Sequence, residues 1–311
     1  MADKPPVCDY EGSDYRTRFW EGQGRGYEDQ VERVALRRLL PPTGRTLIEI
    51  GAGFGRLADE YLGYETVVLF DYSRSLLREA QAVWGHDPRF LFVAGNWYQM
   101  PFIPGLFDTM VQVRTLHHAA DAPALFAQLA RIARPGGRYV LEFANKQNVK
   151  AIGRYWLRRQ SWSPFTLSPV EFVALNFDFH PRWIRQQLHA ARFSPGRTLA
   201  VSYFRFAPLK RLLPTRLLVT LDGMMQHTGR IGQLSPSVFV VSAHPAIGET
   251  AVPDVTAVPD ASAVANTFFA CPLCQSPLGS AVNGRLLCPN SVCARQWQVD
   301  NGLYDFKEPF A

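Results

Sequence analysis

The sequence predicts an α/β fold followed by a small β module that is held together by cysteines. An apolar run, Thr46–Ile50, leads into three alternating glycines and then a helix-like segment. A second apolar run, Val67–Phe70, ends at an acidic residue, Asp71. Four of the five cysteines lie between residues 271 and 293. Strand-like runs that lead into helices are typical of α/β domains, and clustered cysteines are typical of small modules with little core.

The alternating glycines Gly51, Gly53 and Gly55 predict a tight turn that binds a nucleoside derivative. Without Cβ atoms, the polar chain of a ligand can lie against exposed N–H groups at the start of a helix. A dinucleotide fingerprint requires a third small residue where this chain has Arg56. Glu49, two residues before the loop, is better explained by an aminoacyl ligand. The pattern therefore indicates a nucleoside with an amino-acid part.

The segment that contains Glu49, Gly51, Gly53 and Gly55 resembles the first motif of class I S-adenosylmethionine-dependent methyltransferases. The resemblance extends from about residue 27 to residue 145, in the order of the family's motifs. It implies that the glycine loop lies against the methionine part of the cofactor and that Glu49 supports the loop. It also implies a Rossmann-like three-layer fold with a mostly parallel sheet and an antiparallel C-terminal hairpin.

Asp71 matches the family's acidic residue at the end of the second strand, which accepts hydrogen bonds from the ribose hydroxyls. The neighbouring Tyr72 is a further candidate for cofactor binding. In residues 94–102 the family has an aspartate that accepts a hydrogen bond from the adenine amino group, but this chain has Asn96. Its side-chain oxygen can still accept, and Trp97 is expected to cover the adenine ring.

Residues 107–118 resemble the family's fourth strand and the turn after it, which makes Arg114 another candidate for cofactor binding. His117 and His118 in the same turn are the candidate catalytic residues. A structural role is the alternative, because methyl transfer to a good nucleophile needs mainly positioning. Residues 129–137 resemble the turn that leads into the family's fifth strand.

The substrate side of the domain is expected to be basic. Residues 145–230 contain 14 basic and three acidic residues, a net charge of +11. Arg154–Trp162 interleaves arginines with aromatic residues, a pattern that suits RNA, a phospholipid surface or a phosphorylated small molecule. An amphipathic helix with a solvated basic face is the alternative. The closing hairpin is expected to be formed by Thr198–Phe206 and Ser237–Ser242. Between these strands we expect a helical insertion at Leu209–Gln233. Its apolar stripe either lines an acceptor pocket or packs in the core.

Several acceptor chemistries are argued against by the sequence. The chain has no Asn-Pro-Pro-Tyr-like motif after the fourth strand, and no nearby cysteine that could attack a pyrimidine ring. We therefore expect a methyltransferase that acts on a small-molecule or lipid-like acceptor. One alternative is an RNA methyltransferase that uses residues 146–230. Another is a non-catalytic protein that binds S-adenosylmethionine or a partner, a hypothesis motivated by Asn96.

The C-terminal cysteines Cys271, Cys274, Cys288 and Cys293 have the spacing C-x2-C-x13-C-x4-C. Two cysteine pairs near turns predict a structural Zn²⁺ site with a closed four-thiolate shell. A redox dithiol would need a strand–helix setting, whereas prolines and glycines here indicate short turns. The tail also resembles small zinc-ribbon proteins, whose eukaryotic relatives activate methyltransferases by binding them. This implies that the ribbon contacts the methyltransferase domain or a protein partner.

The sequence therefore predicts a methyltransferase domain at residues 1–244, a flexible linker at 245–266 and a zinc ribbon at 267–311. Repeated Val-Pro-Asp in the linker favours extended conformations. No apolar stretch approaches the roughly 20 residues of a membrane span, and residues 1–12 carry charges and prolines instead of the apolar centre of a signal peptide. We expect a cytoplasmic protein without disulfides and with no transmembrane segment.

Overall fold

The computed structural model describes residues 5–20, 23–246 and 268–310. Its α-helices are α1 (Tyr15–Phe19), α2 (Gly26–Leu39), α3 (Arg74–Trp84), α4 (Ala122–Ile132), α5 (Val149–Trp156), α6 (Pro181–Ala190), α7 (Ala207–Leu212) and α8 (Thr215–Met225). Its 3₁₀ helices are η1 (Ala58–Tyr61), η2 (Trp97–Gln99), η3 (Leu116–His118) and η4 (Gln226–Arg230). Within these described ranges, no helix is both long enough and apolar enough to cross a membrane.

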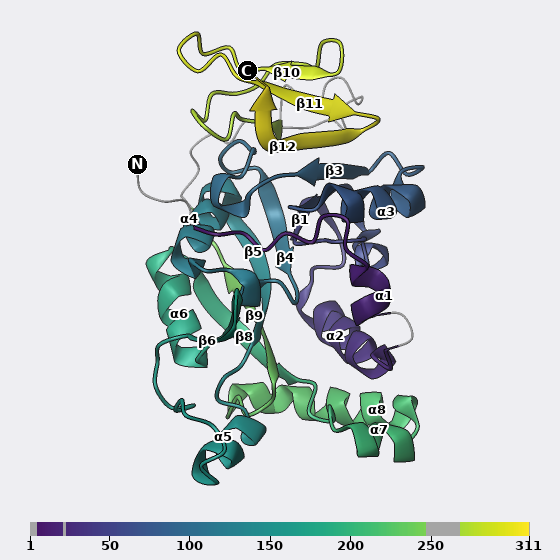
Figure 1. The fold of residues 1–311 in the computed structure, drawn as a ribbon, viewed down its shortest axis with the longest axis vertical. Coiled ribbons are helices and arrows are strands. Elements are labelled where there is room, and N and C mark those ends of the chain that lie inside the picture. Colours follow the sequence, from purple (N-terminus) through teal and green to yellow (C-terminus); the bar gives the residue numbers. More distant parts are fainter. Residues whose placement is uncertain (1–4, 21–22, 247–267, 311) are drawn as a thin grey trace.

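The strands are β1 (Gly44–Ile50), β2 (Tyr64–Asp71), β3 (Phe90–Ala94), β4 (Phe107–Gln112), β5 (Ala133–Ala144), β6 (Val170–Val173), β7 (Asn176–Asp178), β8 (Ser194–Val201), β9 (Ser237–Ala243), β10 (Arg285–Leu287), β11 (Gln296–Asp300) and β12 (Leu303–Phe310). Ten of them form one sheet in the order β10-β11-β12-β3-β2-β1-β4-β5-β9-β8 (Figure 1). Strands β1 to β5 pair in parallel, and β9 pairs antiparallel with both β5 and β8. The predicted mostly parallel sheet with a closing antiparallel hairpin is confirmed.

Helices cover both faces of this sheet. In β1, Ile48 and Ile50 point to one face and pack in the core that also contains residues of α4 and α6. Leu47 points to the other face, whose core contains residues of α2, α3 and α8. Side chains alternate between the two faces of a strand, so a central strand that is buried on both sides is mostly apolar, and Glu49 is the buried exception in β1. The chain therefore forms the expected three layers.

Two of the predicted boundaries were wrong. The glycine loop is followed by the four-residue η1, not by an α-helix, because only seven residues separate Gly55 from Gly63 at the start of the next turn. The first strand of the closing hairpin was expected at Thr198–Phe206 but ends at Val201. Ser202 has a positive φ of 69°, which turns the backbone out of the sheet.

The insertion between β8 and β9 is helical, as predicted, and contains α7, α8 and η4. Leu218 is fully buried, in the core cluster that also contains residues of α2. By contrast, Leu212, Leu217 and Met224 from the predicted apolar stripe are exposed. The stripe thus contributes only in part to the core, and most of it faces solvent.

The C-terminal module continues the main sheet. Its antiparallel strands β10, β11 and β12 are joined to the rest of the sheet where β12 pairs in parallel with β3. Phe269 is fully buried in the core that it shares with the α4 side of the sheet, and its ring lies 5.9 Å from that of Phe102. The module therefore contacts the larger domain extensively. The predicted linker, apart from Pro245 and Ala246, lies outside the described residues.

Candidate active site

The glycine loop follows β1 at the carboxyl edge of the parallel strands. Gly51 has a φ of 73°, and its N–H donates to the Phe70 carbonyl oxygen at 2.8 Å. A Cβ atom on Gly51 would lie 2.3 Å from Cγ2 of Thr115, which follows β4. The position therefore requires glycine for both its conformation and its packing. As a result, the loop after β1 and the turn after β4 lie in direct contact.

Asp71 at the end of β2 fixes the other side of this loop. Its carboxylate accepts hydrogen bonds from the backbone N–H of Gly53 at 2.7 Å and from that of Ser73 at 2.8 Å. Ser73 in turn caps α3 by accepting from Leu76 N–H. Burial raises the pKa of Asp71. Each carboxylate oxygen has a second lone pair, so Asp71 can accept two further hydrogen bonds from hydroxyl groups.

The cavity beside this loop, here called the glycine-loop cavity, contains four of the residues predicted to bind a cofactor. These are Gly51, Asp71, Tyr72 and Trp97. The remaining lining residues are Val7, Cys8, Tyr10, Phe70, Gly95, Thr115 and His118. The cavity volume is about 50 Å³. The N-terminal segment forms its outer wall, which no motif in the sequence indicated.

The other predicted cofactor residues lie behind this cavity or beside it. Gly53 binds Asp71, and a Cβ atom on Gly55 would contact Ala80 of α3 at 3.2 Å. Asn96 caps η2, because its side-chain oxygen accepts from Tyr98 N–H at 2.9 Å. These residues shape the loop and the turn that hold the cavity walls.

Glu49 on β1 is buried close to the loop. Its Oε2 atom has no hydrogen-bond partner among the described residues. Burial raises the pKa of Glu49 to about 8, although Arg56 opposes the shift. A buried carboxyl without a full set of partners favours the protonated form. This unsatisfied oxygen is one observation that a bound cationic or hydrogen-bond-donating group would explain.

A second, larger cavity of about 460 Å³, here called the arginine cavity, shares Tyr10 and His118 with the first. Its other lining residues are Tyr15, Arg25, Arg114, His117, Glu142, Ala144, Phe172, Val173, Asn176, Asp178 and Arg205. Two of the predicted site residues, Arg114 and His117, therefore lie here and not in the glycine-loop cavity. The shared residues make the two cavities neighbours.

The two histidines differ in their contacts. His118 Nδ1 lies 2.9 Å from the carbonyl oxygen of Leu175, which can only accept, so Nδ1 carries a proton. His118 Nε2 lies 3.1 Å from the Tyr10 hydroxyl, which donates to it when the ring is neutral. Burial lowers the pKa of His118. Burial also lowers the pKa of His117, and the neighbouring His118, Arg114 and Arg205 lower it further. His118 is thus engaged by hydrogen bonds at both ring nitrogens, and the His117 ring lies against it with 4.0 Å between the ring centres.

Asp178 at the end of β7 is an acidic lining residue that the sequence analysis missed. Burial raises its pKa to about 6, although Arg154, Arg205 and Lys146 oppose the shift. The sequence did contain one indication of Asp178, because it is one of only three acidic residues in the basic region 145–230. A carboxylate that titrates near neutral pH can accept a proton from a bound molecule.

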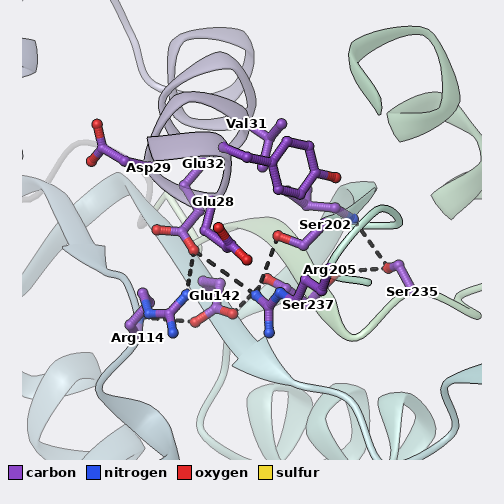
Figure 2. Close-up of polar contacts among 12 residues, drawn as sticks. Glu28, Asp29, Val31, Glu32, Arg114, Glu142, Ser202, Arg205, Ser235 and Ser237 are labelled. Atoms are coloured by element: carbon purple, nitrogen blue, oxygen red, sulfur yellow. Dashed lines mark hydrogen bonds and ion pairs between the residues drawn. The ribbon is translucent and has the colours of Figure 1, made fainter. Parts of the chain in front are cut away.

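A buried ion-pair network centred on Glu32 of α2 supports the arginine cavity (Figure 2). The Glu32 carboxylate accepts from Arg114 at 2.7 Å and from Arg56 at 3.0 Å. Arg205 lies 4.0 Å from it. Burial alone would raise the pKa of Glu32, but the three arginines outweigh burial and hold it below its usual value. Glu32 is therefore ionised at neutral pH.

The turn after β4 is held from two sides. Arg114 has a φ of 59°, and its backbone N–H donates to Glu142 at 2.8 Å. The other oxygen of Glu142 accepts from the Ser237 hydroxyl (Figure 2). The ring of Trp20 lies 4.0 Å from the Arg56 guanidinium and 5.2 Å from that of Arg114. These contacts keep the Arg114 side chain beside Glu32.

The C-terminal module reaches the glycine-loop cavity through Lys307 of β12. Its ammonium lies 3.9 Å from the centre of the Tyr72 ring, and it forms ion pairs with Asp9 at 3.3 Å and Glu11 at 3.5 Å. The Lys307 side chain is only 5% exposed. One residue of the module therefore touches both a lining residue and the N-terminal segment that forms the outer wall.

The four predicted metal ligands meet in one place. The sulfur atoms of Cys271, Cys274, Cys288 and Cys293 all lie within 4.8 Å of one another. The Cys271–Cys293 and Cys274–Cys288 sulfur distances are 3.7 and 3.4 Å. Tetrahedral zinc with Zn–S bonds of about 2.3 Å would hold its sulfurs about 3.8 Å apart. The cluster fits a small zinc ribbon.

Comparisons with known proteins agree with this geometry. Residues 48–141 match the family described as a methyltransferase domain. Demethylmenaquinone methyltransferase from Beutenbergia cavernae is 31% identical over 120 residues, which are 37% of this chain and 48% of that protein. The 24-methylenesterol C-methyltransferase 2 of Arabidopsis thaliana is 24% identical over 139 residues, 41% of this chain and 38% of that protein. The chain spans about half the length, or less, of such curated relatives.

Two solved structures share the fold. An S-adenosylmethionine-dependent methyltransferase from Mesorhizobium loti superposes with a TM-score of 0.51 at 21% identity, covering 70% of this chain and 100% of that one. A chain of the complex between the Haloferax volcanii Trm112 methyltransferase activator and a methyltransferase gives 0.50 at 17% identity, covering 75% and 98%. The fold is therefore the Rossmann-like fold of S-adenosylmethionine-dependent methyltransferases. Within it, residues 48–141 match the methyltransferase-domain family, and the four-cysteine cluster fits a small zinc ribbon.

Glu49→Gln should change how stability depends on pH. Because the folded-state pKa of Glu49 is raised, its stabilising contribution is complete below about pH 4.5 and is lost as pH rises through about 8. In urea unfolding of the ligand-free protein, the wild type should lose stability between about pH 5.5 and pH 8.5. This loss should be about 2–4 kcal/mol smaller in Glu49→Gln. Glu65→Gln, at an exposed position, is the control. Parallel pH profiles for wild type and Glu49→Gln would contradict this account.

Proposed function

We propose that this chain binds S-adenosylmethionine in the glycine-loop cavity and transfers its methyl group directly to a small-molecule or lipid-like acceptor in the arginine cavity. The observation that carries the proposal is the sharing of Tyr10 and His118 between the two cavities. Such an arrangement allows a donor and an acceptor to meet without passing through solvent, and positioning of this kind is the main contribution that methyl transfer needs.

The residues of the glycine-loop cavity fit the cofactor. Gly51 leaves backbone approachable, and Asp71 can accept from two ribose hydroxyls. Trp97 offers a ring for the adenine, and its buried Nε1 has no partner among the described residues. S-adenosylmethionine supplies an electrophilic methyl group on a sulfonium.

The arginine cavity favours an acceptor with an anionic or ionisable group. Arg25, Arg114 and Arg205 line it, and burial lowers the pKa of Arg25 and of Arg205, with repulsion from Arg114 adding to the shift. Arg205 Nε is buried and has no partner in the part of the chain that the structure describes. An anionic group on the acceptor would satisfy this donor and relieve the repulsion. Asp178 or neutral His117 would then accept any proton that the acceptor loses.

The named relatives support a small or lipid-like acceptor. Their names specify demethylmenaquinone and 24-methylenesterol as substrates, which are compact or lipid-soluble molecules. Apolar Phe172 and Val173 of β6 also line the arginine cavity. A mixed apolar and cationic wall suits an amphiphilic acceptor with an apolar body and a polar reacting end.

The four-cysteine cluster supports the further proposal that one structural Zn²⁺ is bound per chain. Replacing Cys274 by serine removes one of four thiolates, and we expect the purified variant to lose zinc and its C-terminal module to unfold, since so small a module depends on its metal. Cys8→Ser is the matched control, because Cys8 lies in the glycine-loop cavity and not in the cluster. Elemental analysis and limited proteolysis would measure both effects. Full zinc content in Cys274→Ser would refute the assignment.

The proposed reaction is tested by following a radiolabelled methyl group from S-adenosylmethionine. Purified full-length protein is incubated with the labelled cofactor and, separately, with lipid extract, polar metabolites or total RNA. We expect label in a lipid or metabolite fraction. Arg205→Gln should lower this transfer by about 10- to 100-fold, the effect of removing a hydrogen bond to a charged group, while cofactor affinity changes little.

Arg285→Gln is the control, because Arg285 is an exposed arginine on the C-terminal module. Label that enters RNA alone would favour the RNA methyltransferase alternative. Tight cofactor binding without transfer to any fraction would favour the non-catalytic alternative. Equal transfer by wild type and Arg205→Gln would refute the assignment of the acceptor to the arginine cavity.

A further inference from the structure

One end of the molecule presents large apolar side chains to solvent. In and after α5, Trp156 is 73% exposed and Leu157 is also exposed. In the insertion between β8 and β9, Leu212 is 80% exposed and Ile231 is 96% exposed. Phe206 at the start of α7 is exposed as well. Single exposed apolar residues are ordinary, but a group of this size marks an interaction surface.

These residues belong to one end of the fold. Figure 1 shows α5, α7 and α8 at the end of the molecule opposite β10, β11 and β12. The two segments are connected by hydrogen bonds, since Val149 N–H at the start of α5 donates to the Leu234 carbonyl oxygen at 2.9 Å. We call the exposed side chains of residues 149–159 and 206–231 the basic–apolar face.

The charges on this face are almost all positive. Residues 149–159 contain four basic residues and no acidic residue, and Arg154, Arg158 and Arg159 are exposed around Trp156 and Leu157. Residues 206–231 contain four basic residues, of which Lys210 pairs with Glu28 of α2, and one acidic residue. That acid, Asp222, is buried and accepts from the Tyr27 hydroxyl, so it does not offset the charge at the surface.

We propose that the basic–apolar face binds the surface of an anionic lipid bilayer. Aromatic and aliphatic side chains that alternate with arginines match the boundary between acyl chains and anionic headgroups. Trp156 and Phe206 could also stack on bases, but the larger number of exposed side chains on this face are leucine, isoleucine and methionine, which suit acyl chains and offer no aromatic face, and this favours a bilayer over RNA. The inference concerns where the chain binds and does not depend on methyl transfer.

The arginine cavity lies close to this face. Arg154 of α5 is near enough to Asp178 in the cavity wall to affect its pKa. The Lys146 ammonium donates to the Ser168 carbonyl at 2.6 Å, which ties the start of this segment to the chain leading into β6. A bilayer held at the basic–apolar face would therefore lie next to the wall of the acceptor cavity.

The test is co-sedimentation of the full chain with phosphatidylcholine vesicles, with and without about one-third phosphatidylserine. We expect binding to the anionic vesicles only, and weaker binding at about 0.5 M salt. The triple variant R154Q/R158Q/R159Q should bind about 100-fold more weakly, because each basic residue near an anionic surface contributes roughly fivefold. The double variant W156A/L157A should also lose binding, through lost apolar insertion.

The matched control is R285Q/V292A, which removes an exposed arginine and an exposed valine from the C-terminal module. It should bind like the wild type. Far-ultraviolet circular dichroism checks that every variant is folded. The proposal is overturned if the wild type does not bind anionic vesicles, if it binds transfer RNA but not vesicles, or if the control loses as much binding as the triple variant.

Discussion

The buried carboxylate of Glu32 is the contact on which the rest of the site depends. It holds guanidinium groups from three segments that are distant in sequence, namely Arg56 after the glycine loop, Arg114 after β4 and Arg205 after β8. Its side chain has no exposed area, and three arginines packed this closely would repel one another without it. Breaking a buried pair of this kind typically costs about 3–5 kcal/mol, since the remaining charge is left uncompensated. Glu32 therefore holds together the segments that follow β1, β4 and β8.

The C-terminal module contacts the same part of the molecule. Strand β12 extends the sheet at β3, and the ion pair between Arg74 and Asp305 at 2.6 Å connects the module to the start of α3. Lys307 contacts Tyr72 in the glycine-loop cavity, and it also pairs with acidic residues of the N-terminal segment. The module that holds the four-cysteine cluster thus contacts the N-terminal segment that lines the glycine-loop cavity. Strand β12 therefore connects the C-terminal module both to the sheet and to the glycine-loop cavity.

Local patterns in the sequence predicted the parts that depend on local physics. Gly51 needs its positive φ, Asp71 follows a buried strand, and the cysteine spacing is that of paired turns, so each could be identified without knowledge of the fold. Glu32 could not, because a charged residue on an amphipathic helix is usually solvated. Asp178 and Tyr10 were missed for the same reason, since their positions depend on contacts between distant segments. The short η1 was missed because the glycine pattern alone does not specify the length of the following helix.

The most direct test of the account is calorimetric titration of the zinc-loaded full chain with S-adenosylhomocysteine and, separately, with NADH. The account predicts binding of S-adenosylhomocysteine and not of NADH. It also predicts a roughly 10- to 100-fold weaker affinity in Asp71→Ala, from the loss of hydrogen bonds to a charged group. Asp59→Ala is the control, because its carboxylate pairs with Arg33 outside the cavity. Equal affinity in wild type and Asp71→Ala, or binding of NADH in place of S-adenosylhomocysteine, would contradict the account.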